Sequence, residues 1–419
     1  MTDRTKAPEI YSTEHIQLAT PSTRTSDSGI PFYFIENIPE DAVKITLEFA
    51  AGKMYQNRSL QAGFTADLLL SGTATKTQQE IQVSIDFFGG YVQSEMAMER
   101  SSLTIYGLKK NIASIFEIVK DAFFNATFPE DEFERHRTIE KQKFIVNMEK
   151  NAVKARKLFI NHLFQGTPFD SNADIPDFDE ISRQDCIDFY ESYFKQCLMD
   201  VNVVGNLDDT FKEKLINDLS PLKINIPTPP AFELHPETGF FEEKKENALQ
   251  TAIRIGKPLF TPEHPDYIAF DVVNTLLGGY FGSRLMSNIR EDKGYTYGIG
   301  SGVVSMKSLG YFYIATEVGV EVKEDALFQI RHEIERLQTE LVPEEELELV
   351  RNYMIGQMLK STDGPFAMMN QFLFLNWYEL DTTYFDTYMK TIQTISPEQI
   401  RELAQKYLKW ETFSIITVG

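Results

Sequence analysis

Apolar and polar residues alternate strictly near the start of the chain. The alternating residues are Val43, Lys44, Ile45, Thr46, Leu47, Glu48 and Phe49. A period of two residues indicates a β-strand in a sheet that has one covered face. A shorter apolar run from Thr251 to Ile255 predicts a corresponding strand in the second half of the chain.

Other segments have the spacing and the end signals of helices. Apolar residues recur at helical intervals at Ile112, Ile115, Phe116, Val119 and Phe123. Ser59 is the predicted N-cap of a helix that runs to Leu70. Pro129 and Pro343 are each followed by acidic residues, which suit the positive end of a helix dipole. We therefore interpret the acidic runs as helix starts rather than as metal ligands.

Residues also recur at fixed distances, which indicates an internal repeat. Val203-Val204-Gly205 matches Thr417-Val418-Gly419 at an offset of 214, the difference between positions 419 and 205. Further upstream, Gly52 matches Gly256 at an offset of 204, the difference between positions 256 and 52. An insertion of ten residues in the second half accounts for the change of offset.

Proline is dense in the middle of the chain, at Pro227, Pro229, Pro230 and Pro236. Such a segment ends regular structure and stiffens a connection. We predict an N-terminal domain at 1–225, a linker at 226–240 and a C-terminal domain at 241–419. The predicted fold class is α+β, with two homologous two-layer α/β domains. Each domain has a mostly antiparallel sheet covered by helices on one face, and the two domains enclose a cleft.

Composition narrows the possible partners. The 419 residues include 41 Lys and Arg against 62 Asp and Glu, which gives a net charge of −21. This charge repels nucleic acid and anionic membrane surfaces, and we expect neither as a partner. The two cysteines are too few for a disulfide framework, and no apolar run is long enough for a signal peptide or a spanning helix. We expect a cytoplasmic protein.

The usual signs of catalytic chemistry are missing. The six histidines never stand three or four residues apart, and neither H-E-x-x-H nor H-x-x-E-H is present. We interpret His136 as a surface residue of a charged helix. No G-x-S-x-G motif marks a nucleophile, although a dispersed triad is not excluded. Gly298-Ile299-Gly300-Ser301-Gly302 precedes a predicted strand, so it is a weak sign of dinucleotide binding.

One segment carries a family resemblance. A glycine-rich turn from Gly278 to Gly282 leads into Ser283-Arg284-Leu285, and the signature R-E-x-x-G-x-x-Y runs from Arg290 to Tyr297. Together with the repeat, this segment resembles the insulinase/pitrilysin family of zinc peptidases. The resemblance covers the chain from about Val43 to Gly419. It implies two α/β domains and, in active members, an H-x-x-E-H helix, a later glutamate ligand and zinc-assisted peptide hydrolysis.

This chain departs from the family at the zinc site. The family motif falls on Gly63-Phe64-Thr65-Ala66-Asp67, so Gly63, Ala66 and Asp67 replace the two histidines and the catalytic glutamate. The later helix offers Glu140, Lys141, Gln142 and Lys143 where the third ligand is sought. Two carboxylates without histidine form a poor zinc site. We therefore expect no metal or other cofactor in this chain, with zinc held by a partner chain.

The resemblance assigns other residues to the substrate. Arg290 and Tyr297, seven positions apart, correspond to an auxiliary catalytic pair that binds substrate and stabilises the oxyanion. Alternatively, Arg290 pairs with a nearby acid and Tyr297 begins a strand. Gly278, Gly279 and Gly282 are the implied substrate-binding turn.

The main hypothesis is a zinc-less subunit of a two-chain peptidase, inactive alone. Its partner would be a homologous H-x-x-E-H subunit, or a second copy of itself, and its substrate a peptide. The alternatives are a non-enzymatic peptide-binding or scaffold protein of the same fold, which captures a peptide at a sheet edge, and a hydrolase with a divergent site.

Overall fold

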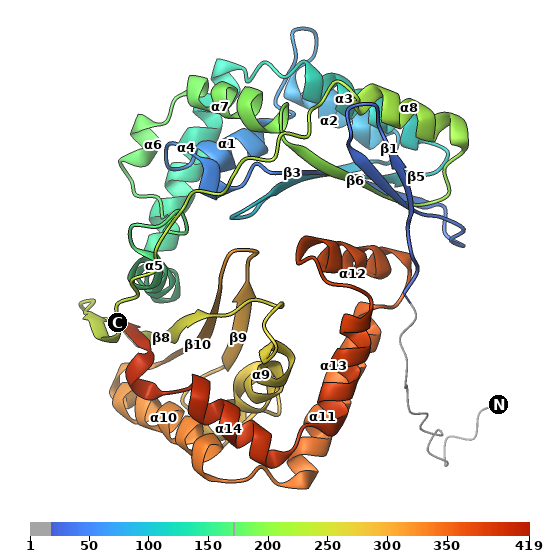
Figure 1. The fold of residues 1–419 in the computed structure, drawn as a ribbon. Coiled ribbons are helices and arrows are strands. Elements are labelled where there is room, and N and C mark those ends of the chain that lie inside the picture. The colour runs from blue at the N-terminus through green and yellow to red at the C-terminus, as the bar shows by residue number, and fades with distance from the viewer. Residues whose placement is uncertain (1–17, 171) are drawn as a thin grey trace, which may run out of the picture.

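The computed structural model describes residues 18–170 and 172–419, which form two halves that face each other (Figure 1). The sheet of the first half has six strands in the described chain. Their order is β1 (Ser22–Thr25), β2 (Pro31–Ile35), β6 (Leu198–Val204), β3 (Ala42–Phe49), β5 (Ser101–Leu108) and β4 (Tyr91–Met96). Only β2 and β6 pair in parallel.

The second half repeats this topology without a counterpart of β1. The order of its strands is β7 (Gly239–Glu243), β11 (Ser414–Val418), β8 (Gln250–Leu259), β10 (Gly310–Gly319) and β9 (Ile299–Ser305). The parallel pair, β7 and β11, lies at one end of this sheet, whereas β1 lies outside the parallel pair of the first sheet. The predicted fold class is therefore confirmed, and both sheets are mostly antiparallel.

Helices cover the outer face of each sheet. In the first half they are α1 (Gln61–Leu68), α2 (Gln78–Phe87), α3 (Ile112–Phe124), α4 (Glu130–Met148), α5 (Asn151–Phe164), α6 (Asp177–Glu180), α7 (Arg183–Phe189) and α8 (Asp209–Leu219), with short turns η1 (Lys53–Tyr55) and η2 (Tyr190–Phe194). Among these helices α5 is the exception, because it leaves its own half.

The second half contains a corresponding set. Its helices are α9 (Tyr267–Asn274), α10 (Lys323–Thr339), α11 (Glu344–Ser361), α12 (Pro365–Trp377), α13 (Thr383–Thr394) and α14 (Pro397–Tyr407), with the shorter η3 (Thr275–Gly279), η4 (Met286–Asp292), η5 (Val320–Val322) and η6 (Trp410–Thr412). The starts of α4 and α11, at positions 130 and 344, differ by 214. The starts of α5 and α12, at positions 151 and 365, differ by the same number, which is the larger offset of the sequence repeat.

Each half sends one helix to the inner face of the other half's sheet. Helix α5 packs on β8 and β11, and α12 packs on β6. The face of β3 that the alternating pattern predicts to be covered is the outer face, where Val43, Ile45 and Phe49 are buried in the core of the first half. The polar residues of the same strand, Lys44, Thr46 and Glu48, line a cavity together with residues of α12 from the other half.

The repeated glycines have a common physical reason. A β-carbon on Gly52 would lie 2.3 Å from the carbonyl carbon of Glu99, and one on Gly256 would lie 2.1 Å from the carbonyl oxygen of Phe312. Only glycine permits backbones to approach this closely.

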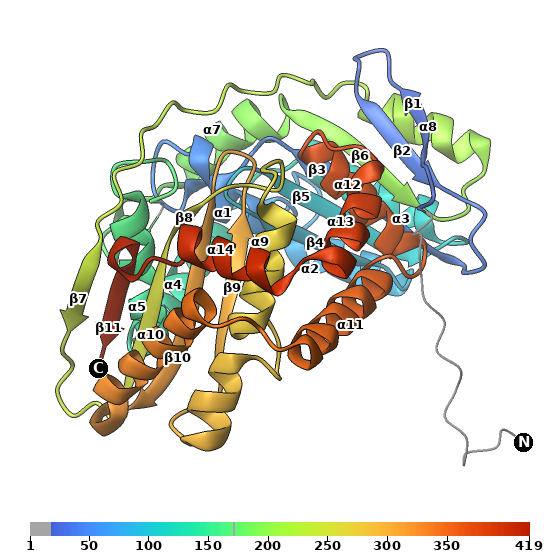
Figure 2. The same cartoon turned by 60° about the horizontal axis from the view of Figure 1, so that its bottom comes forward.

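The connection between the halves is extended. Residues 226–238 form neither helix nor strand, and β7 begins at Gly239. Figure 2 shows this segment running along one side of the molecule to β7. None of the helices in the described part of the chain has the length and apolar character needed to cross a membrane.

Candidate functional site

The positions of the absent zinc motif lie on α1. This helix is preceded by Leu60, whose φ is +69°, so the prediction of Ser59 as the N-cap is wrong. Gln61 accepts a hydrogen bond from the backbone N–H of Asn57 at 2.9 Å, which ties the preceding turn to the helix. Around Gly63 the space for a β-carbon is open, Ala66 is buried, and Asp67 is exposed.

A histidine from α4 faces this helix. His136 Nε2 lies 3.4 Å from Asp67 Oδ2, and its ring packs edge-on against Phe64 at a centroid distance of 4.7 Å. Because only 17% of the His136 side chain is exposed, its interpretation as a surface residue is wrong. His136 lies three positions after the buried Phe133, and that helical spacing was the available signal that it faces inward.

Glu140, the carboxylate of the later helix where the third zinc ligand is sought, forms an ion pair of its own. Glu140 pairs with Lys143 at 2.7 Å, and Lys141 pairs with Asp179 at 2.6 Å. Lys143 and Lys53 both interact electrostatically with Asp67. Ammonium groups therefore supply the positive charge around this carboxylate.

These side chains do not fit a catalytic zinc ion. Such a site uses three protein ligands at distances of about 2 Å, with a position left for water. Asp67 and His136 are two donors, and the lysines beside Asp67 repel a cation. Among residues 18–170 and 172–419, no group of three or more His, Cys, Asp or Glu side chains is placed to hold a metal ion.

Arg290 and Tyr297 occupy the surface of the second half. Arg290 lies in η4, and its guanidinium stacks on the ring of Phe281 at 4.6 Å. Tyr297 precedes β9, and 96% of it is exposed. It borders a crevice of about 300 Å³ between α5 and the sheet of the second half, lined also by Ala155 and Arg254.

The glycine-rich turn packs closely against its own domain. A β-carbon on Gly278 would lie 2.6 Å from the backbone nitrogen of Ser301 in β9, and Gly282 lies against the ring of Tyr280. Beyond the turn, Arg284 forms a bidentate pair with Glu346 at 2.8 and 2.9 Å. Glu346 belongs to the acidic first turn of α11, which supports the structural interpretation of that acidic run.

Comparisons with known proteins agree with this geometry. Residues 33–172 match the family model described as Insulinase (Peptidase family M16), and residues 180–354 match the one described as Peptidase M16 inactive domain. The chain therefore belongs to the insulinase family, peptidase family M16, and it lacks that family's H-x-x-E-H motif.

Individual relatives are distant but extend over most of the chain. An uncharacterized zinc protease of Bacillus subtilis, YmxG, is 22% identical over 83% of this chain and 86% of its own length. A probable inactive metalloprotease of the same species, YmfF, is 24% identical over 56% of this chain and 55% of its own length. A solved peptidase M16 inactive domain from Pseudomonas fluorescens is 22% identical and superposes with a TM-score of 0.82, covering 95% of this chain and 98% of that one.

Proposed function

We propose that this chain is the zinc-less subunit of a two-chain insulinase-type peptidase. The observation that carries the proposal is the contrast between its two candidate sites. The positions of the zinc motif hold Gly63, Ala66 and Asp67, whereas the pair Arg290 and Tyr297 is present and Tyr297 is almost fully exposed.

The chemistry of this pair suits a substrate held by another chain. An arginine guanidinium donates two parallel hydrogen bonds to carbonyl or carboxylate oxygens, and a phenol donates one to a developing oxyanion. Stacking on Phe281 holds Arg290 at the surface. The partner in this proposal is a homologous subunit that carries H-x-x-E-H and binds the zinc; a homodimer is the alternative assembly. We place the complex in the cytoplasm.

Reconstitution with a partner tests the proposal. A homologous chain with H-x-x-E-H is co-expressed and purified with wild-type or variant subunit, and the cleavage of unstructured peptides is measured. We expect Arg290→Ala or Tyr297→Phe to lower kcat by about 10²- to 10³-fold, the usual effect of removing an oxyanion donor.

The matched control is Arg331→Ala. Arg331 is also an arginine of the second half that stacks on an aromatic ring, that of Trp410 at 5.8 Å. This control should leave turnover unchanged, and thermal melts of all three variants should stay close to wild type. Unchanged turnover in Arg290→Ala and Tyr297→Phe, with a lowered melting temperature, would assign both residues a structural role.

That outcome would favour a non-enzymatic peptide-binding or scaffold protein. The observation behind this second candidate is that β4 and β9 are edge strands of their sheets. An extended peptide can add to such an edge through main-chain hydrogen bonds without being cleaved.

A further inference from the structure

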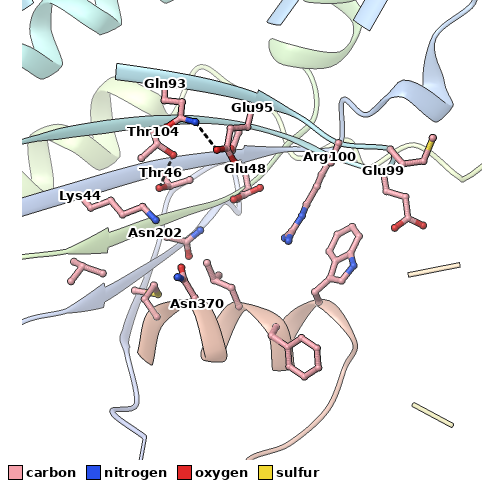
Figure 3. A pocket seen from close by; sticks show the side chains of 18 of the residues that line it. Lys44, Thr46, Glu48, Gln93, Glu95, Glu99, Arg100, Thr104, Asn202 and Asn370 are labelled. Atoms are coloured by element: carbon pink, nitrogen blue, oxygen red, sulfur yellow. Dashed lines mark hydrogen bonds between the residues drawn. The ribbon is translucent and has the colours of Figure 1, made fainter. Parts of the chain in front are cut away.

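A polar cavity separates the sheet of the first half from α12. Its volume is about 540 Å³, which is within the usual range for small-molecule sites. Strands β3, β4, β5 and β6 form one wall of the cavity, which we call its floor, and α12 forms the opposite wall, which we call its roof. Figure 3 draws the floor above and the roof below. Glu95, on edge strand β4, lines the cavity and is exposed, so the cavity opens at that edge.

The floor presents charged groups of both signs. Figure 3 shows Lys44, Glu48 and Arg100 pointing into the cavity. Within the described chain, the side chains of Glu48 and Arg100 form no hydrogen bond or ion pair with another residue, and the guanidinium of Arg100 stacks on Trp377 at 4.7 Å. Enclosed charges that lack direct partners are costly, and a ligand of matching charge relieves that cost.

A buried acceptor also faces this space. Asn202 lines the cavity, is 3% exposed, and donates a hydrogen bond from Nδ2 to Asp200 at 2.7 Å. Its Oδ1 has no hydrogen-bond partner among the described residues. Buried amide oxygens normally have one, so this atom is an unsatisfied acceptor in the wall of the cavity.

The roof is mostly apolar apart from Asn370, and the space continues into a second cavity. Leu373, Phe374 and Trp377 of α12 face the floor. Arg100 and Trp377 also line a neighbouring cavity of about 300 Å³, whose other walls include Pro227 and Pro229 of the linker. A ligand with both charged and apolar parts has a place for each.

The corresponding space in the other half, between its sheet and α5, is smaller, a crevice of about 300 Å³. The two offsets of the sequence repeat align Glu48 with Ala252 and Asn202 with Ile416. Ala252 and Ile416 pack with Phe159 of α5 in one apolar cluster. One inner face therefore packs on its helix mainly through apolar side chains, whereas the other encloses a larger cavity lined by polar and charged side chains.

We propose that the cavity under α12 binds a small amphiphilic zwitterion, with its ammonium on Glu48, its carboxylate on Arg100 and its apolar group against Trp377. The free amino acid with an aromatic side chain is the simplest molecule of this class, and a dipeptide with an aromatic C-terminal residue carries the same groups with its two charges further apart. This site is separate from Arg290 and Tyr297, and the proposal does not depend on the peptidase assignment.

Four probes test the ligand chemistry by thermal shift and calorimetry on the full-length protein, up to millimolar concentration. They are L-phenylalanine, L-phenylalaninamide, 3-phenylpropionate and the dipeptide alanyl-phenylalanine. Stabilisation by phenylalanine but neither single-charge analogue supports the free amino acid, and a stronger effect of the dipeptide supports a dipeptide as the ligand. If no probe shifts the melt, or if 3-phenylpropionate acts as strongly as the zwitterions, the proposal is wrong.

Two substitutions test the location. Glu48→Gln and Arg100→Gln should each weaken binding by about 10- to 100-fold, the effect of losing a hydrogen bond between charged groups. The matched control is Glu317→Gln, which changes a strand glutamate that lines the crevice on the other sheet. Equal affinity in Glu48→Gln and Glu317→Gln would overturn the assignment. Melts of the unliganded variants show that each is folded.

Discussion

Glu48 lies in an environment that differs from what its sequence position indicates. In the alternating pattern of β3 it stands on the polar side, which in a sheet with one covered face is the solvated side. In the folded chain it lies under α12, and burial together with Asp200 and Glu95 raises its pKa from 4.5 to about 7, against the opposing effect of Arg100 and Lys44. Burial likewise raises the pKa of Asp200 to about 6.

This raised pKa makes stability depend on pH. The folded state binds a proton at Glu48 more tightly than the unfolded state, so the stabilisation is complete below about pH 4.5 and is lost as pH rises through about 7. We expect Glu48→Gln, which keeps the neutral form, to gain stability relative to wild type across that range. The gain is roughly 3 kcal/mol at most, because one pKa unit corresponds to about 1.4 kcal/mol.

Urea unfolding of wild type and Glu48→Gln, at pH values below, within and above this range, measures the difference. Glu317→Gln shows the effect of losing a glutamate from the other sheet. A stability difference between Glu48→Gln and wild type that does not change with pH would contradict the shifted pKa.

Single residues of the candidate site were predictable only where a local pattern carried the information. The spacing of Arg290 and Tyr297 and the loss of the zinc motif at Gly63 and Asp67 are visible in the sequence. The contact between Asp67 and His136 joins helices about 70 positions apart, and sequence spacing does not encode it. The environment of Glu48 likewise depends on a helix from the opposite half.

At the scale of elements, α5 and α12 occupy corresponding places in the two halves but pack differently. Helix α5 buries Phe159 against the second sheet, where the ring lies 5.6 Å from the guanidinium of Arg254. Helix α12 buries Met369 beside Ile35 and Val204, and its remaining length covers the polar cavity. The sequence predicted the central strands β3 and β8 and the starts of α4 and α11. It could not predict that α5 and α12 each pack on the sheet of the other half, because periodicity identifies an apolar face but not the surface on which that face packs.

This asymmetry predicts unequal effects of two similar substitutions. Phe159→Ala removes a fully buried ring of α5 and should lower the free energy of unfolding by about 3–5 kcal/mol. Phe372→Ala in α12 removes a partly buried ring, which contacts Tyr33 at a centroid distance of 4.8 Å, and should cost less. Chemical unfolding of both variants measures the difference. Equal losses would mean that α12 holds the halves together as firmly as α5.

For the whole molecule, the two halves are joined by more than the linker. The carboxylate of Glu99 in the first half accepts hydrogen bonds from the backbone N–H groups of Lys307 and Ser308, at 2.6 and 3.0 Å. The apolar cluster around Phe159 also contains side chains from both halves. The repeat in the sequence predicted two similar sheets and a space between them. The closure of that space by Glu99 and α5 required the folded chain, since each contact spans more than 90 positions.

The isolated chain lacks the side chains that a catalytic zinc site of this family requires. We expect no stoichiometric zinc and no endopeptidase activity, because Gly63, Ala66 and Asp67 remove both imidazoles and the general base, and because His136 and Asp67 are too few ligands for a catalytic ion. Elemental analysis of protein purified without chelator, and an assay on unstructured peptides with and without added zinc, measure both properties. A relative with an intact H-x-x-E-H motif, prepared in the same way, is the positive control. One tightly bound zinc ion per chain together with chelator-sensitive cleavage would show that a different set of ligands performs the reaction, and the zinc-less subunit proposal would then be wrong.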